Sequence, residues 1–273
     1  MALPVGTSRR QDAGVSAATF DELIAAGEAA DVTGWGFSWL EGRATEERPP
    51  WGYARLLGER LRDARASLDL QTGGGEVLAE APSFPLVAVA TESWPPNASA
   101  ATARLHARGV AVVVAGDEPP LPFAGGAFDL VTSRHPARIW WEEIARVLTP
   151  GGTYFAQHVG PASAFELIEF FLGPLPDARR GRHHDDEVAA ARDAGLEVAD
   201  LRTARTRIEI RDVAAVVYLL RKVVWWVPGF TVERFGDRLH DLHELIEREG
   251  PFVAYSSRHL LEARKPPSGR VRD

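Results

Sequence analysis

Between residues 66 and 157 the sequence alternates short apolar runs with helix-compatible segments, and this alternation constrains the fold more than any other feature. Runs typical of buried strands occupy Ala66–Leu70, Leu86–Ala90, Val110–Ala115, Phe128–Thr132 and Thr153–Gln157. Segments that favour helices separate most of them, at Val77–Glu80, Ala98–Arg108 and Ile139–Leu148. Because parallel strands need crossover connections, this order predicts βαβ units and a parallel sheet covered on both faces.

The last third of the chain predicts that an antiparallel pair closes the sheet. Two long strand-like stretches, Glu197–Ile210 and Phe252–Glu262, flank two helical segments, Val213–Trp226 and Thr231–Arg248. An acidic first turn marks a further helix at Asp185–Ala194. A strand, a helical insert and a returning strand are typical of two neighbouring antiparallel strands at one edge.

The N-terminal part predicts helices. Thr19-Phe-Asp-Glu22 has the spacing of a capping box, which predicts a helix from there to Ala30. A second helix is expected after Pro49-Pro50, through Asp63. We therefore expect one α/β domain over residues 65–264, preceded by a helical cap at 1–64. A helical insert at about 212–250 and a disordered tail at 265–273 complete the expected organisation.

Composition excludes several classes of protein. The chain has no cysteine, which rules out disulfides, thiolate metal ligands and a cysteine nucleophile. The longest apolar runs, such as Val213–Leu220, fall far short of the roughly 18 residues that a membrane span needs. Met1 to Asp12 has no apolar stretch of the signal-peptide type, so we expect a cytoplasmic protein without membrane association.

The charge of the chain disfavours nucleic acid as a partner. The net charge is −7, and although 31 residues are basic they are scattered along the chain. Such a chain does not produce the broad positive field that nonspecific nucleic-acid binding requires. A small-molecule partner is therefore expected, for a protein that is a monomer or a homodimer.

The most informative stretch is Ser67-Leu-Asp-Leu-Gln-Thr-Gly-Gly-Gly-Glu76, where a strand enters a glycine-rich turn. A helix is expected to follow, so that a ligand could approach the backbone near a helix N-terminus. A dinucleotide fingerprint would need G-x-G-x-x-G, but Leu78 occupies the third glycine position. The turn therefore disfavours a nicotinamide dehydrogenase.

This turn resembles the first motif of class I S-adenosylmethionine-dependent methyltransferases, acid-x-G-x-G-x-G. Asp69 corresponds to the acid, and Gly73 and Gly75 to the second and third glycines. Gln71 stands at the position of the first glycine. We expect Gln71 to fit there with a negative φ and with its side chain turned away.

Downstream motifs follow in the family's order and extend the resemblance over residues 65–160. Glu92 lies 17 residues after Gly75, and Asp117 lies four residues before Leu121-Pro-Phe123. The resemblance implies that Glu92 accepts hydrogen bonds from the ribose hydroxyls and that Asp117 accepts from the adenine amine. Two further segments match the family's fourth strand and the corner before its fifth strand: Phe128-Asp-Leu-Val131 and Arg146-Val-Leu-Thr-Pro-Gly-Gly152.

The resemblance implies a Rossmann-like, mostly parallel seven-stranded sheet and S-adenosyl-L-methionine as cofactor. The residues expected at the cofactor, all near strand ends or in the glycine turn, are Asp69, Gln71, Thr72, Gly73, Gly75, Glu92, Ser93, Asp117, Glu118 and Ser133. Each motif also has a simpler interpretation: the glycines as a tight turn, Glu92 as a solvated acid, and Asp117-Glu118 as turn residues before Pro119-Pro120.

Two histidines are candidates for a general base. His135 follows the fourth of the predicted strands and His158 the fifth, and a neutral imidazole can accept a proton at physiological pH. The alternative is that each only makes local hydrogen bonds at a strand end. The pair His183-His184 lacks a third ligand at a defined spacing, so we expect no metal site.

Aromatic residues outside the predicted sheet are candidates for an acceptor pocket or for simple packing: Trp35, Phe37, Trp39, Trp225 and Trp226. Together these features predict a methyltransferase that modifies oxygen or nitrogen of a small organic metabolite. Two alternatives stay open: an RNA-base methyltransferase, and a protein of this fold that binds the cofactor without transferring methyl.

Overall fold

The computed structural model describes residues 18–34, 36–116 and 118–267. Their strands form one eight-stranded sheet in the order β1-β7-β8-β6-β5-β2-β3-β4. The chain divides into two compact units, and each is built from three separate segments. The first unit takes its described residues from 1–49, 162–181 and 205–257, and the second takes them from 50–161, 182–204 and 258–273.

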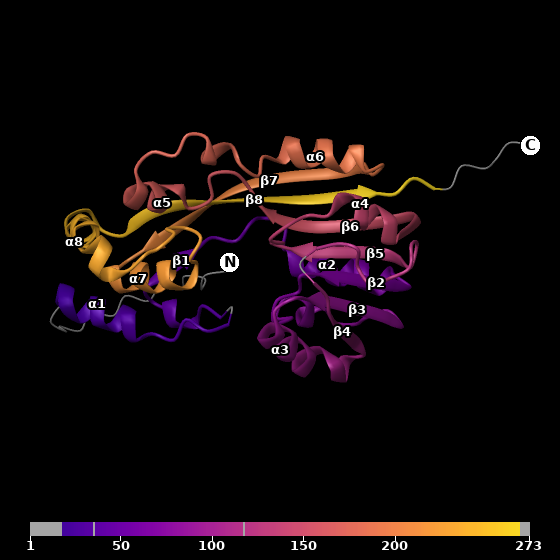
Figure 1. The fold of residues 1–273 in the computed structure, drawn as a ribbon, viewed down its shortest axis with the longest axis horizontal. Helices are drawn as coiled ribbons and strands as arrows, with labels where there is room; N and C mark the ends of the chain where they lie inside the picture. Colours follow the sequence, from indigo (N-terminus) through magenta and orange to yellow (C-terminus); the bar gives the residue numbers. More distant parts are fainter. Residues whose placement is uncertain (1–17, 35, 117, 268–273) are drawn as a thin grey trace, which may run out of the picture. The chain divides into compact units, whose positions relative to one another are not determined.

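The second unit contains the predicted parallel sheet. Its strands are β2 (Ala66–Leu70), β3 (Val87–Glu92), β4 (Val110–Val114), β5 (Phe128–Arg134) and β6 (Leu148–Val159). Figure 1 shows these five strands side by side, and every neighbouring pair among them is parallel. Strand β8 (Phe252–Arg264) then pairs antiparallel with β6 and places His259 opposite His158. The predicted α/β class and antiparallel closure are confirmed.

Both faces of this sheet are covered, because apolar side chains of successive strand residues pack on opposite sides. On one face Leu130, Phe155 and Leu260 pack with helices α2 (Tyr53–Asp63) and α3 (Pro95–Leu105). Their immediate neighbours Val131, Tyr154 and Leu261 pack on the opposite face, with α4 (Trp141–Val147) and α6 (His184–Asp193). Successive side chains of a strand point to opposite faces, so each strand contributes to two apolar cores.

The segment after the glycine turn differs from the prediction. Instead of an α-helix it contains the three-residue 3-10 helix η2 (Leu78–Glu80). Pro82 and Pro85 follow closely, and proline cannot donate to a helical ladder and restricts the residue before it. The turn therefore has no α-helix N-terminus behind it. The next helical turns are α3 and the 3-10 helix η3 (His106–Arg108), after β3.

The first unit is mainly helical. It contains α1 (Phe20–Ala29), η1 (Ser38–Leu40), α5 (Phe165–Leu172), η4 (Ala178–Arg180), α7 (Val213–Lys222) and α8 (Val232–Glu249). The short strand β1 (Ala44–Glu46) pairs antiparallel with the end of β7 (Glu197–Ile210). Strand β1 is the eighth strand, which the predicted seven-stranded sheet lacks. The predicted capping box of α1 is confirmed, because Thr19 and Glu22 exchange both hydrogen bonds.

The predicted domain limits stay a prediction, because the two compact units divide the chain in a different way. Helix α2, which the sequence grouped with the N-terminal cap, belongs to the same compact unit as the parallel sheet. Most of the predicted tail, residues 268–273, lies outside the described residues. Among the described helices, none combines the length and the apolar composition needed to span a membrane.

Candidate functional site

The predicted site residues that the structure describes lie in the second unit, mostly around the ends of parallel strands β2, β3, β5 and β6. The turn after β2 begins with Thr72, whose amide donates to Thr91 O at 2.9 Å, and it closes with Gly75 N donating to Thr72 O at 3.2 Å. Gly73 (φ +64°) and Gly75 (φ +76°) are left-handed, a conformation that glycine adopts without steric cost. The glycines are therefore required by the shape of this turn.

Gln71 departs from the expectation of a negative φ. Its φ is +53°, so it takes a left-handed conformation, which glycine adopts more easily than other residues. Its side chain does not turn away freely, because Nε2 donates to Arg138 O at 2.7 Å and Oε1 accepts from Ala137 N at 2.7 Å. These bonds offset a conformational cost of about 1–2 kcal/mol. Gln71 thus ties the turn after β2 to the loop after β5.

Glu92 is at the end of β3, as predicted, and its carboxylate binds the glycine turn. Oε2 accepts from Gly73 N at 2.8 Å, and Oε1 accepts from Ser93 N and Trp94 N, each at 3.1 Å. A carboxylate has about four lone-pair sites, so three backbone donors leave room for a further donor from a ligand. Glu92 is buried and bonded to Gly73, so its remaining acceptor capacity lies directly beside the turn.

Asp69 lies beneath the turn as a buried acid. Burial raises its pKa to about 6, while the Thr132 hydroxyl, which donates to Oδ1 at 2.6 Å, lowers it. Thr72 Oγ1 also lowers this pKa through its proximity, but it is buried without a hydrogen bond of normal geometry. A buried hydroxyl that lacks a full partner is unusual in a folded protein.

The other predicted cofactor residues have varied environments. Ser133 is buried, and its Oγ lies 2.6 Å from the Tyr154 hydroxyl, so its side chain belongs to the interior. Ser93 offers its backbone amide to Glu92. The Glu118 side chain is largely exposed and pairs with Arg138 at 3.6 Å. Asp117 lies outside the described residues.

His135 is held by a hydrogen-bonded chain that defines its tautomer. The Trp51 indole can only donate, so Gln157 Oε1 accepts from it at 2.7 Å and Gln157 Nε2 must donate to His135 Nε2 at 3.0 Å. His135 Nε2 is therefore unprotonated. Burial lowers the pKa of His135 well below its usual value, which agrees with a neutral ring. Its Nε2 lone pair, the one a base would use, is already engaged by Gln157.

His158 belongs to a second chain of polar groups. Its Nε2 lies 3.0 Å from the Tyr154 hydroxyl, and its Nδ1 lies 2.6 Å from Glu187 Oε2. The same oxygen of Glu187 lies 2.5 Å from His259 Nε2. Burial lowers the pKa of His158, whereas Glu187 has its pKa lowered to about 2 because the hydrogen bonds from both imidazoles outweigh burial. Through Tyr154, His158 is linked to Ser133 near the end of β5.

The residues that the sequence did not predict are those that complete these two hydrogen-bonded groups of side chains. Trp51, Gln157, Tyr154, Glu187 and His259 come from a loop, two strands and a helix that are far apart in sequence. No short motif contains two of the groups that meet, apart from the i, i+4 pair Tyr154 and His158 on β6. Only the antiparallel register of β6 and β8 brings His259 to His158.

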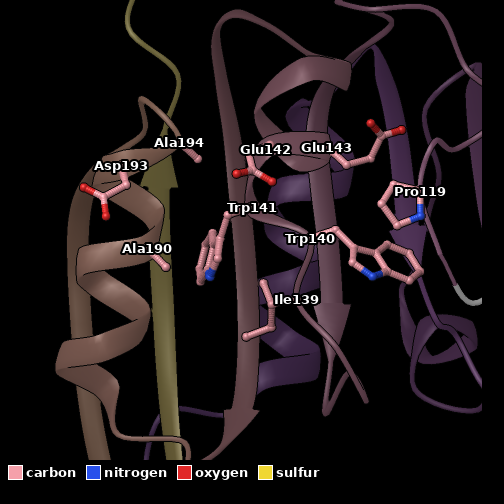
Figure 2. Close-up of a pocket in the computed structure, with 9 residues that line it drawn as sticks. All are labelled: Pro119, Ile139, Trp140, Trp141, Glu142, Glu143, Ala190, Asp193 and Ala194. Atoms are coloured by element: carbon pink, nitrogen blue, oxygen red, sulfur yellow. The ribbon is translucent and has the colours of Figure 1, made fainter.

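A pocket of about 430 Å³ lies away from the glycine turn, between α4 and α6. Figure 2 shows its two tryptophans pointing apart, Trp141 toward Ala190 of α6 and Trp140 toward Pro119. The lining contains none of the predicted site residues. This pocket is therefore separate from the strand-end site.

A match to a known family covers the same strands and glycine turn as the candidate site. Residues 68–156 match the family model described as a methyltransferase domain. A crystal structure from Bacillus halodurans C-125, provisionally assigned as a methyltransferase, shares 22% identity with a TM-score of 0.56. The alignment covers 79% of this chain and 99% of that one.

Two further structures share the fold. The YcgJ protein of Bacillus subtilis is 17% identical with a TM-score of 0.54, over 79% of this chain and 99% of that one. The [4+2]-cyclase SpnF is 19% identical with a TM-score of 0.50, over 79% and 81%. At these identities the likeness concerns the fold. The sequence comparison with curated proteins finds no match.

Proposed function

We propose that this chain, whose residues 68–156 match the family model described as a methyltransferase domain, methylates oxygen or nitrogen of a small organic metabolite with S-adenosyl-L-methionine. The observation that carries this proposal is the pairing of Glu92 with the left-handed turn at Gly73. An acidic acceptor at the end of the second parallel strand, bonded to a glycine turn at the end of the first, suits a ligand with neighbouring hydroxyls.

The residues at the strand ends fit the cofactor. Glu92, with one acceptor position left beside its three backbone donors, would accept from a ribose hydroxyl, and the backbone of Gly73 and Gly75 would allow close approach. Thr72 Oγ1, buried without a full hydrogen bond, would gain a polar partner. Asp69 would support the turn from beneath, and Ser93, Asp117, Glu118 and Ser133 would complete the proposed surroundings. Bound there, the cofactor supplies an electrophilic methyl group on a sulfonium.

The protein's own contribution would be alignment and exclusion of water. The Gln71 side chain, bonded to Ala137 and Arg138, holds the loop after β5 beside the glycine turn and so fixes two walls of the proposed site. The base role of His135 and His158 stays a prediction. His135 Nε2 is engaged by Gln157, so His158, through Tyr154, has the better path to the strand ends.

The choice of a small acceptor rests on charge. With a net charge of −7, the chain is poorly suited to a phosphate backbone. Fewer aromatic residues remain for the proposed acceptor pocket than the sequence suggests. Trp39 stacks on Tyr218 with ring centroids 4.9 Å apart, and Phe37 is buried within the first unit. These two rings are accounted for by packing. Trp35 lies outside the described residues.

Calorimetric titration with S-adenosylmethionine and S-adenosylhomocysteine tests the cofactor. Glu92→Ala is expected to weaken binding by about 1.5–3 kcal/mol, because a charged acceptor for a ribose hydroxyl is lost. Glu76→Ala, which removes a half-exposed carboxylate next to the same turn, is the matched control and should bind like wild type. The absence of binding at high micromolar concentration to wild-type protein would exclude the cofactor, and unchanged affinity in Glu92→Ala would remove Glu92 from the site.

A second candidate is a protein of this fold that binds the cofactor without methyl transfer. Gln71, a non-glycine residue with its side chain bridged across the turn, favours this candidate. The name of the [4+2]-cyclase SpnF shows that this fold also hosts other reactions. A screen of amine, phenol and carboxylate acceptors with radiolabelled cofactor separates the two. Cofactor binding with no labelled product would favour the second candidate.

A further inference from the structure

Two histidines and a glutamate from three elements of the second unit converge beside the end of β6. They are His158 on β6, His259 on β8 and Glu187 on α6. One possible ligand atom from each lies within 4.8 Å of the other two. The antiparallel register sets His158 directly opposite His259, and their rings meet edge to face with centroids 5.2 Å apart. The sheet itself thus fixes the two imidazoles as a pair.

The donor atoms converge on one point. Glu187 Oε2 lies 2.6 Å from His158 Nδ1 and 2.5 Å from His259 Nε2. Two imidazole nitrogens with one carboxylate oxygen are a donor set that suits zinc and related divalent ions. Around a tetrahedral ion with ion–ligand distances of about 2.0–2.2 Å, ligand atoms are about 3.3–3.6 Å apart, so each of these two N···O separations would have to widen by about 1 Å.

Burial favours a cation at this point. His158 and His259 are 2% and 1% exposed, and the Glu187 side chain is 12% exposed. The Glu187 carboxylate, which lies against both imidazoles, brings one negative charge into this largely buried cluster. A divalent ion would compensate it directly. The partly exposed ring of His184, 6.3 Å from the His259 ring, marks the side from which an ion could enter.

The surroundings of His158 also suit a metal ligand. Its other ring nitrogen, Nε2, lies 3.0 Å from the Tyr154 hydroxyl, which in turn lies 2.6 Å from Ser133 Oγ. Metal-bound histidines generally donate their second N–H to such a partner, which fixes the ring's orientation and tautomer. With an ion at Nδ1, His158 Nε2–H would donate to Tyr154. The polar chain therefore serves as the outer support of the cluster.

We propose that His158, Glu187 and His259 bind a divalent transition-metal ion of the zinc type. Three protein ligands leave a fourth position for water or a substrate oxygen. The site does not depend on the cofactor proposed above, since none of its three residues belongs to the glycine turn. Metal binding would occupy Nδ1 and leave Nε2 protonated, so His158 would act as a ligand in place of the predicted base.

Titration of the metal-stripped protein with ZnCl₂, without S-adenosylmethionine, tests the site. We expect one equivalent to bind with a Kd below about 1 µM, with a rise in Tm. CoCl₂ should produce visible absorption bands of a four-coordinate ion. His259→Ala and the nearly isosteric Glu187→Gln should each weaken binding by at least roughly 10-fold.

The exposed cluster His183, His184 and Asp185 supplies the matched control, because its atoms could also attract zinc. The double variant His183→Ala/His184→Ala should keep the one equivalent. Absence of zinc binding to wild type would overturn the proposal, and so would loss of binding in the double variant or wild-type affinity in both single variants. Circular dichroism confirms folding, and Glu187→Gln decides if His259→Ala does not fold. Because no cofactor is added, failure here leaves the proposed methyl transfer untouched.

Discussion

Gln71 takes a backbone conformation that glycine usually supplies, and its side chain explains how. The side-chain amide of Gln71 accepts a hydrogen bond from Ala137 N and donates one to Arg138 O. These two hydrogen bonds offset the free-energy cost of the left-handed φ. The sequence identifies Gln71 as the odd member of the motif. It cannot reveal the sign of φ, because that depends on a loop more than 60 residues further along the chain.

Asp69 provides a prediction at the same scale. Its pKa is about 6 in the folded protein and near 3.8 when unfolded, so the folded state binds the extra proton between these values. The contribution of Asp69 to stability therefore falls as the pH rises from about 4 to about 6. Above pH 6 the buried, ionised group costs about 3 kcal/mol at most.

Asp69→Asn should remove this pH dependence, because the amide oxygen can still accept from Thr132 and carries no charge. Urea unfolding of both proteins without cofactor, at pH 4 to 8, measures the effect. We expect the variant to become more stable relative to wild type as the pH rises, with the change centred between pH 4 and 6. A constant difference across this range would contradict the raised pKa.

At the scale of elements, the glycine turn packs against α3. A Cβ on Gly75 would lie 2.8 Å from Leu105 Cδ1 and 3.4 Å from Ala101 Cα, both on α3. The third glycine of the motif therefore maintains the packing of a turn on a helix. The sequence predicted the glycine from its motif, but this second reason depends on how α3 lies.

Gly75→Ala should reduce the free energy of unfolding by about 2–4 kcal/mol, from backbone strain plus the clash with Leu105. Gly126→Ala is the matched control, because Gly126 has a similar φ of +68° and nothing within 4 Å of the added Cβ. It should cost only about 1 kcal/mol. Chemical denaturation compares the two variants, and equal losses would show that the Leu105 contact is unimportant.

Element prediction succeeded where local patterns decide the structure. Strands β2 and β7 and the C-terminal end of α2 lie where the sequence predicts them, because apolar runs and turn residues mark their limits. Strand β1 and helix α5 were missed. β1 is three residues long and exists by pairing with β7, and α5 begins at Ala164 in a left-handed conformation without a side-chain cap. Such elements are set by tertiary contacts that local patterns do not contain.

At the scale of the whole molecule, the candidate site divides into a predictable and an unpredictable part. Glu92 and the glycines were found because they follow strand ends in chain order. The cluster of His158, Glu187 and His259 was not, because its members are 29 and 72 residues apart in sequence. Their meeting depends on the pairing of β8 with β6, which sequence order alone does not place in register.

The role of β8 leads to a prediction about fragments. In residues 1–251 strand β6 would lose its antiparallel partner, and Phe155, Tyr154 and Ala156 would lose the neighbours Leu260, Leu261 and Ala263. We expect this fragment to be insoluble or to lack a cooperative unfolding transition, since an unpaired apolar edge favours aggregation. Size-exclusion chromatography and thermal unfolding, compared with residues 1–267, measure this. A soluble, cooperatively folding fragment would contradict it.

The interleaving of the two units has a consequence for how such a protein can arise and be rearranged. The chain passes from one unit to the other at five positions, and two of these lie inside the continuous strands β7 and β8. Neither unit can be exchanged as a cassette by a single recombination event, because no contiguous piece contains the whole of one unit without part of the other. New specificity would more readily be acquired through substitutions and loop insertions than through shuffling of whole units.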